Sequence, residues 1–106
     1  MNKFMRLLVM FDLPVTEAEE RRAAARFRQF LLKDGYHMMQ FSIYVRICNG
    51  ADDVEKHIRR LYDNVPGNGS VRCLTVTEKQ FEAMHLLTGP LTVAEQSAGD
   101  LQVTFF

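Results

Sequence analysis

Phe4-Met5-Arg6-Leu7-Leu8-Val9-Met10-Phe11-Asp12-Leu13-Pro14 contains the most apolar run of the chain and ends in a carboxylate followed by a proline. From Leu7 to Phe11 there is no polar residue and no alternation, which is typical of a strand covered on both faces in the middle of a sheet. Pro14 ends the strand because it lacks a backbone donor, so Asp12 is expected at the strand's carboxyl end. Strand tips of this kind often carry chemistry, and an Asp that only caps the turn is the alternative.

The composition predicts one compact domain. The 106 residues are 47% apolar, and the 13 basic and 13 acidic side chains balance, although eight basic and five acidic ones lie in residues 1–50. Cys48 and Cys73 are far apart and belong to no Cys/His cluster, which argues against a disulfide framework and a zinc site. The amino-terminal apolar run is too short to span a bilayer and lacks a cleavage site, so we expect a soluble, cytoplasmic protein.

The segment after Pro14 predicts a helix with an apolar face and a basic face. Thr16-Glu17-Ala18-Glu19 has the form of a capping box, the helix is expected from Glu17 to Lys33, and Gly35 would end it. Its apolar positions are Ala23, Phe27, Phe30 and Leu31. A second face, called the basic stripe below, consists of Arg22, Arg26, Gln29 and Lys33. The stripe would be about 16 Å long and could contact several phosphates, while a solvated helix face is the alternative.

Residues 36–87 predict a hairpin, a second helix, another strand and a short last helix. From Tyr36 to Ile47 the period is two, with an apolar face formed by His37, Met39, Phe41, Ile43, Val45 and Ile47, and a bend at Gln40-Phe41-Ser42 could split the strand. The second helix would be capped by Asp52 or Asp53 and would bury Val54, Ile58, Leu61 and Tyr62. Val71–Thr77 reads as a strand, and the capping box Thr77-Glu78-Lys79-Gln80 begins a helix expected to reach about Leu87.

The order of these elements is βαββαβ, an α+β plan of the ferredoxin-like kind, formed by residues 1–87. Residues 88–106 read as a connecting arm and a C-terminal strand, in which Leu101, Val103 and Phe105 alternate with polar or aromatic neighbours. An extended arm of that length could reach a second subunit. This extra strand is therefore expected either to be exchanged in a two-fold homodimer or to dock on its own sheet.

Five motifs in this order and spacing resemble the CRISPR-associated Cas2 family of small endoribonucleases and spacer-acquisition proteins, in particular its type II branch. They are Phe11-Asp12-Leu13-Pro14, Arg26–Leu32, Gly35-Tyr36, Gln40-Phe41-Ser42-Ile43-Tyr44 and Thr75–Phe81. The resemblance implies a homodimer in which Asp12 of both subunits, as catalytic residue and metal ligand, holds one magnesium ion. A magnesium ion prefers several oxygen ligands, so a pair of carboxylates with waters and a phosphate oxygen is physically reasonable.

The resemblance also implies contacts to nucleic acid. Ser42 would contact phosphate, Tyr44 would stack on a base, and Arg22 matches an arginine near the helix start, so that the nucleic-acid-binding residues are Arg22, Arg26, Lys33, Ser42 and Tyr44. Met38 stands where some members have a basic residue. His37, His57 and His85 share no ligand spacing and are assigned to the surface or the core.

The function implied is that of a CRISPR adaptation subunit. Such a subunit bridges two dimers of the integrase Cas1, binds double-stranded DNA during spacer acquisition, and has magnesium-dependent endonuclease activity on RNA or DNA, including single-stranded RNA, as a second activity. A toxin-type ribonuclease of the same fold and a non-catalytic ferredoxin-like nucleic-acid-binding module are the alternatives. The module is disfavoured because the aromatic sheet motif of RNA-recognition domains and a Gly-rich phosphate loop are both absent.

Overall fold

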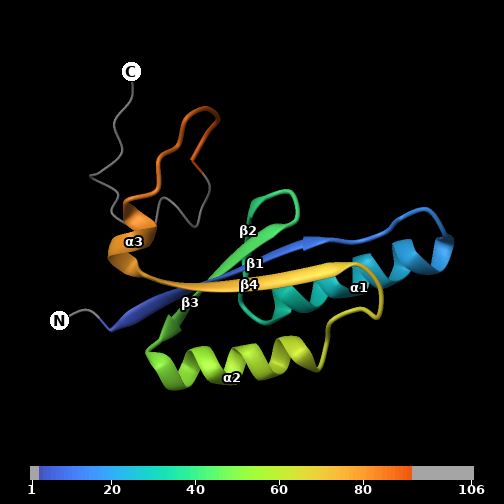
Figure 1. Cartoon of the computed structure of the whole chain (residues 1–106), viewed down its shortest axis with the longest axis horizontal. Helices are drawn as coiled ribbons and strands as arrows, with labels where there is room; N and C mark the ends of the chain where they lie inside the picture. Colours follow the sequence, from blue (N-terminus) through green and yellow to red (C-terminus); the bar gives the residue numbers. More distant parts are fainter. Residues whose placement is uncertain (1–2, 92–106) are drawn as a thin grey trace.

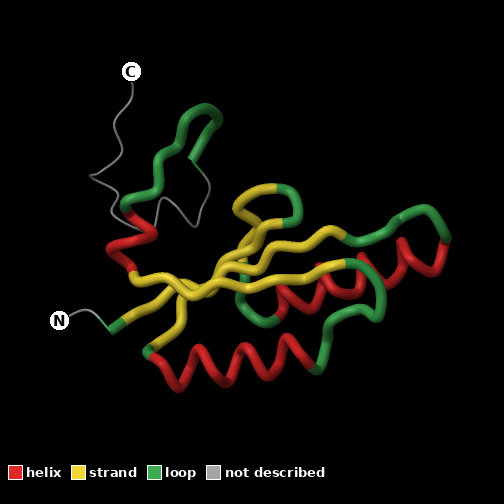
Figure 2. The backbone as a smooth tube through the Cα atoms, in the orientation of Figure 1, coloured by secondary structure: helices red, strands yellow, loops and turns green. Residues whose placement is uncertain are grey.

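The computed structural model describes residues 3–91, which form a sheet with helices on both faces (Figure 1). The elements in chain order are β1 (Phe4–Asp12), α1 (Ala18–Lys33), β2 (His37–Gln40), β3 (Ile43–Asn49), α2 (Ala51–Tyr62), β4 (Ser70–Thr77) and α3 (Glu78–Glu82). Figure 2 shows that the loop after β1 and the loop before β4 lie at the same end of the sheet. None of the helices among residues 3–91 is long and apolar enough to cross a membrane.

The sheet has the strand order β2-β3-β1-β4, and every neighbouring pair is antiparallel. This order, with α1 and α2 on one face, confirms the α+β ferredoxin-like prediction for the described residues. β1 lies between β3 and β4, as its uninterrupted apolar run predicted. The predicted bend is also present, because β2 ends at Gln40 and β3 begins at Ile43.

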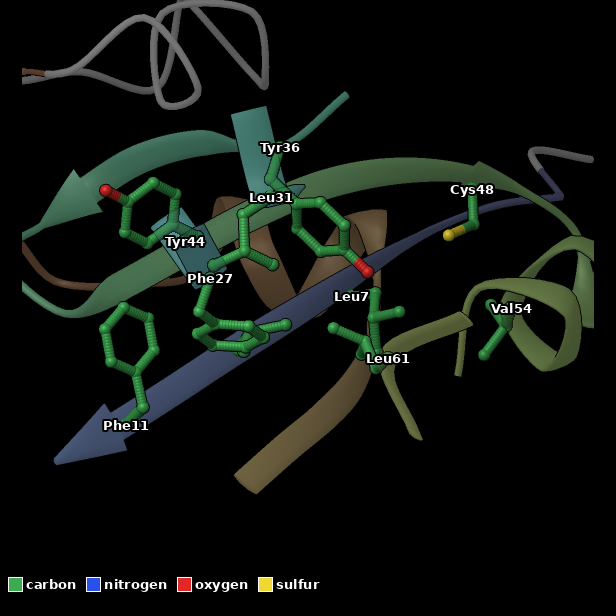
Figure 3. Packing of buried hydrophobic residues seen from close by; sticks show 10 residues of the cluster. Leu7, Phe11, Phe27, Leu31, Tyr36, Tyr44, Cys48, Val54 and Leu61 are labelled. Atoms are coloured by element: carbon green, nitrogen blue, oxygen red, sulfur yellow. The ribbon is translucent and has the colours of Figure 1, made fainter. Parts of the chain in front are cut away.

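The main core lies between the sheet and the helices α1 and α2. Leu7, Val9 and Phe11 of β1 point to this side. They pack against buried side chains of both helices and of the hairpin: Phe27, Leu31, Tyr36, Tyr44, Cys48, Val54 and Leu61. Figure 3 shows the rings of Phe11, Phe27 and Tyr44 near the carboxyl end of β1, with Cys48 and Val54 at the other end of the cluster.

A smaller cluster covers part of the opposite face. Leu8 and Val45 are buried there beneath Phe81 of α3. The helix is held by the ion pair between Arg6 and Glu78, in which the Arg6 side chain is only 2% exposed, and the Arg6 guanidinium lies 4.6 Å from the centre of the Phe81 ring. β1 therefore buries side chains on both faces, and one of them is a charged group with a carboxylate partner.

Several helix boundaries differ from the predicted ones. The capping box of α1 is one residue later, because the backbone N–H of Glu17 donates to the Glu20 carboxylate at 2.8 Å. Gly50, with φ of 88°, is the N-cap of α2, while Asp53 accepts from the Asn49 N–H at 2.8 Å. The capping box of α3 at Thr77 and Gln80 is confirmed, but this helix ends at Glu82 and not near Leu87.

The faces of two elements were also assigned wrongly. Tyr62 is 77% exposed, and α2 buries His57 in its place. On β3 the main core takes Tyr44 and Cys48, whereas the face predicted to be apolar supplies Val45 to the smaller cluster. The prediction failed because Arg46, counted as polar and outward, is accommodated beneath the helices by hydrogen bonds. The predicted C-terminal strand, residues 101–106, lies outside the described residues.

Candidate metal and nucleic-acid site at the end of β1

Asp12 is the last residue of β1, and its side chain is exposed. It pairs with Ser70, the first residue of β4. The loop before β4 approaches so closely that a Cβ atom on Gly69 would lie 2.6 Å from the carbonyl oxygen of Asp12. Gly69 also has φ of +86°, a conformation that other residues rarely adopt. Two constraints on Gly69 thus fix the backbone at the point where Asp12 emerges from the sheet.

A pocket of about 360 Å³ lies beside Asp12. Three strand ends and the β2–β3 turn form its wall, with the lining residues Met10, Phe11, Asp12, Phe41, Ser42, Ile43, Ser70 and Arg72. The structure therefore brings Asp12 and Ser42 to one pocket, and it adds Arg72, which no motif in the sequence had pointed to. This set of eight residues is called the Asp12 pocket below.

The β2–β3 turn is anchored to the end of β1. The backbone N–H of Phe11 donates to the carbonyl oxygen of Ser42 at 3.1 Å. Ser42 has φ of 68°, and among the described residues it is the one non-glycine residue with positive φ. This conformation costs on the order of 1 kcal/mol in a residue with a Cβ atom. The strained turn and its hydrogen bond hold Ser42 next to Asp12.

The Asp12 carboxylate makes no ion pair or hydrogen bond within residues 3–91. No group of three His, Cys, Asp or Glu side chains that could hold a metal ion occurs in the same range. One carboxylate is too few for a magnesium ion, which favours octahedral oxygen coordination. The pocket of a single chain therefore offers too few ligands for such an ion, and a magnesium site here would need a second carboxylate from another molecule.

Tyr44 does not line the Asp12 pocket. Its side chain is 3% exposed, and its ring stacks on Phe11 in the core with 5.7 Å between ring centres (Figure 3). The ring is thus occupied by a core neighbour, which is incompatible with stacking on a base in this conformation. The Ser-x-aromatic motif placed Tyr44 on the pocket side, but the strand's alternation turns residue 44 to the face that the helices cover.

The basic stripe lies on an exposed face of α1, away from the Asp12 pocket. Arg22, Arg26, Gln29 and Lys33 are all exposed, and they border two hollows that share no residue with that pocket. The hollow between α1 and α2, about 320 Å³, is lined by Arg26, Gln29, Phe30, Lys33, Asp34 and Arg60. Arg60 of α2 thus borders the same hollow as the stripe, and its guanidinium is paired with the Asp34 carboxylate. The sequence could not reveal this, because the packing of α2 on α1 brings it there.

Charged groups of a different kind lie between the end of α1, β3 and α2. This polar cluster consists of Asp34, Arg46, Asp53, His57 and Arg60. The two ring nitrogens of His57 lie 3.1 Å from Asp34 Oδ2 and 3.3 Å from Asp53 Oδ1. Arg60 pairs with the Asp34 carboxylate, and Arg46 donates to the Asp34 carbonyl oxygen. His57 therefore belongs to the core, which was one of the two assignments its spacing left open.

The polar cluster changes the proton affinities of nearby groups. The hydrogen bond from the Asn49 N–H lowers the pKa of Asp53, so its contribution to stability is present at neutral pH and is lost as acid protonates it. Burial raises the pKa of the Cys48 thiol, and burial with the nearby Asp34 carboxylate raises that of the Tyr36 phenol. Both groups are thus neutral at physiological pH, and neither is positioned as a nucleophile.

Comparison with known proteins identifies the family. The family model for CRISPR associated protein Cas2 matches residues 5–84. The chain is 54% identical over 102 residues to the CRISPR-associated endoribonuclease Cas2 of Acidovorax ebreus, covering 96% of this chain and 100% of that protein. The proteins of the same name from Campylobacter jejuni and Streptococcus mutans (serotype c, strain UA159) are 42% and 46% identical, covering 99% and 80% of this chain and 73% and 78% of theirs. The chain thus belongs to the CRISPR-associated Cas2 family.

Proposed function

We propose that this protein is a CRISPR adaptation subunit that binds nucleic acid and, as a second activity, hydrolyses phosphodiester bonds at the Asp12 pocket. The observation that carries the proposal is an exposed, unpaired carboxylate at a rigid strand end, in a pocket that also contains a serine hydroxyl and an arginine. Family membership supports the proposal, and relatives bear the name endoribonuclease. An unpaired charge beside a strained turn is more typical of a functional site than of a structural one.

The donor set fits a magnesium ion only if two copies of the chain meet. In that arrangement Asp12 of each copy would supply one carboxylate, and waters and a phosphate oxygen would complete the ligands. The ion, when bound, would polarise the phosphoryl oxygen and lower the pKa of a water molecule. A homodimer is consistent with apolar side chains left exposed along the sheet: Leu74, opposite Leu8, and Ile47, opposite Arg6, are 52% and 44% exposed.

The protein's own side chains would bind and orient the substrate. Arg72 would pair with a phosphate, because the guanidinium group matches the geometry of phosphate oxygens. Within residues 3–91, the Arg72 side chain has no carboxylate partner. The Ser42 hydroxyl would donate a hydrogen bond to a second phosphate oxygen. The anchored turn fixes the backbone of Ser42, and the pairing of β4 with β1 fixes the backbone of Arg72 opposite Met10. Such placement near Asp12 favours catalysis because less ordering is needed on binding.

Longer duplex DNA would be held by the basic stripe. Arg22, Arg26 and Lys33 are exposed, lie along one helix face and have no ion-pair partner among the described residues. A row of unpaired cations binds phosphates without reading the sequence. Such binding suits the role of a scaffold that bridges two Cas1 integrase dimers around the DNA to be inserted, which requires no catalysis by this subunit.

The hydrolytic activity is tested with Asp12→Asn. This variant keeps the shape of the side chain but loses the charge that a cation needs, so turnover of RNA or DNA should fall by at least about a hundredfold. The measurement is cleavage of labelled oligonucleotides with magnesium and with excess chelator. Ser70→Ala, also in the pocket but without charge, is the control. Full activity of Asp12→Asn, or cleavage in chelator, would refute the metal assignment.

The two-copy arrangement is tested by removing residues 88–106. If the tail contributes a strand to a second subunit, the shortened protein should have the solution mass of a monomer and the full chain that of a dimer, measured by light scattering. Circular dichroism would confirm that residues 3–87 remain folded. A shortened protein that stays a stable dimer would contradict strand exchange. The dimer contact would then be formed by the sheet of residues 1–87.

A further inference from the structure

Phe41 is an aromatic side chain exposed at the wall of the Asp12 pocket. It is 78% exposed, although burying a phenylalanine is worth about 2 kcal/mol. The residue belongs to the two-residue turn between β2 and β3 and lines the pocket together with Asp12 and Arg72. The period-two pattern of residues 36–47 had predicted that Phe41 lies on the apolar face of a strand. An exposed ring at this place is therefore not explained by the core.

The ring is held in place from two directions. The turn that carries it is strained at Ser42 and is tied to the backbone of Phe11 by the 3.1 Å hydrogen bond. From α1, the guanidinium of Arg28 lies 4.9 Å from the centre of the Phe41 ring and 5.5 Å from that of Phe11. Arg28 thus connects the exposed ring to a core ring by two cation–π contacts. These contacts limit the motion of Phe41 while most of its ring remains in contact with solvent.

The surroundings of the ring match the parts of one nucleotide. A base has an apolar face that stacks on an aromatic ring, and its phosphate is an anion that an arginine binds. Phe41 supplies the aromatic ring and Arg72 the cation, and both line one pocket of about 360 Å³ together with Asp12. Stacking on a protein ring requires a base that is not already stacked and paired within a duplex. The pocket therefore suits an unpaired nucleotide.

We propose that Phe41 is a stacking platform for one unpaired base at the Asp12 pocket, and that Arg28 positions its ring. This inference rests on the proposed nucleic-acid function and specifies the substrate at this site as single-stranded. It replaces the stacking role that the family resemblance implied for Tyr44, whose ring is buried. The proposed occupant is a nucleobase, because Arg72 in the same pocket has no carboxylate partner within residues 3–91 and would bind the phosphate of that nucleotide. A second copy that meets this one at Asp12 would leave the ring open to the base.

The test compares binding of two probes at equal charge, a short fluorescein-labelled oligouridine and an abasic oligonucleotide of the same length, with chelator present to prevent hydrolysis. Phe41→Ala should weaken binding of oligouridine by about tenfold and leave abasic binding unchanged. Phe41→Trp should retain the affinity. Because the chain has no tryptophan, the fluorescence of this variant should also be quenched by oligouridine and not by the abasic probe. Arg28→Lys keeps the charge and should reduce the preference for oligouridine over the abasic probe.

Tyr62 provides the matched control, since it is 77% exposed and lies on α2, outside the Asp12 pocket. Tyr62→Ala should bind both probes like the unchanged protein, and the fluorescence of Tyr62→Trp should not respond. Equal affinity of the unchanged protein and Phe41→Ala for oligouridine would overturn the platform alone. A change in solution mass of Phe41→Ala would also overturn it, by assigning the ring to a contact between copies. Failure of the unchanged protein to bind either probe would overturn the proposed function together with the platform.

Discussion

Asp34 and Asp12 are carboxylates with opposite surroundings. Asp34 is 8% exposed and is contacted by His57 and Arg60, while its backbone carbonyl accepts from Arg46. Asp12 is exposed and has no such partner within the described part of the chain. Buried charges need partners to be tolerated, whereas an exposed charge on a rigid backbone can be kept for a ligand. The comparison separates charges that hold the fold from charges that are available for binding.

The largest effect is expected for the available charges of the basic stripe. Replacing Arg22, Arg26 and Lys33 by Gln should weaken duplex DNA binding strongly at low salt, since each lost phosphate contact reduces the log–log salt slope by about 0.9. In a dimer, with six such contacts, the total reduction could reach about five. Stability should change by only about half a kcal/mol per residue, because exposed charges contribute little to folding. The measurement is a salt titration of duplex binding, with and without the integrase.

A triple replacement elsewhere on the surface supplies the control for that titration. Lys3, Arg59 and Lys79 are exposed and lie outside the stripe, and changing them to Gln alters the net charge equally. This control variant should keep most of the slope. If the log–log salt slope falls equally in the two triple variants, binding follows net charge and the stripe is only a solvated helix face.

An intermediate effect on stability is expected when the same substitution is made at the two carboxylates. Asp34→Asn removes the charge that His57 and Arg60 face, so the free energy of unfolding should fall by about 3 kcal/mol. Asp12→Asn should change it by about half a kcal/mol or less. Urea unfolding of both variants at neutral pH measures the difference. Equal losses would mean that Asp12 also supports the fold, and the distinction between the two carboxylates would be lost.

The smallest effect concerns a polar atom next to the polar cluster. Tyr36 is 1% exposed, and its hydroxyl has no hydrogen-bond partner among residues 3–91. Tyr36→Phe removes this unsatisfied group, so it should stabilise the protein by up to about 1 kcal/mol. Tyr44→Phe is the control and should give no gain, since its hydroxyl is not a buried atom without a partner. A clear loss of stability in Tyr36→Phe would show that the hydroxyl is satisfied in solution.

The sequence predicted what depends on local pattern. The apolar run of β1, the bend before Ile43 and the capping box of α3 are each encoded within a few residues, and all three are confirmed. Asp12 at the end of β1 followed from Pro14 alone. These features needed no information about which segments pack together.

What the sequence could not predict depends on contacts between distant segments. Asp34, one partner of His57, comes from the end of α1, so no spacing reveals it, whereas Asp53 lies four residues before His57 on the same helix. Arg28 and Arg72 reach the surroundings of the Asp12 pocket only after α1 and β4 have packed. The face on which Tyr44 lies was misjudged because Arg46 seemed to mark a solvent side. A polar side chain marks the solvent-exposed face of a strand only where the opposite face has no buried hydrogen-bond partner for it.

The ion pair between Arg6 and Glu78 has a consequence for how the chain folds during its synthesis. The two residues are 72 positions apart, yet Arg6 lies in the central strand, which also needs β4 as a neighbour. During synthesis the amino-terminal strand leaves the ribosome first and must wait, with its apolar run unprotected, until the second half of the chain has been translated. The sheet and its ion pair can therefore be completed only after the segment carrying Glu78 has left the ribosome.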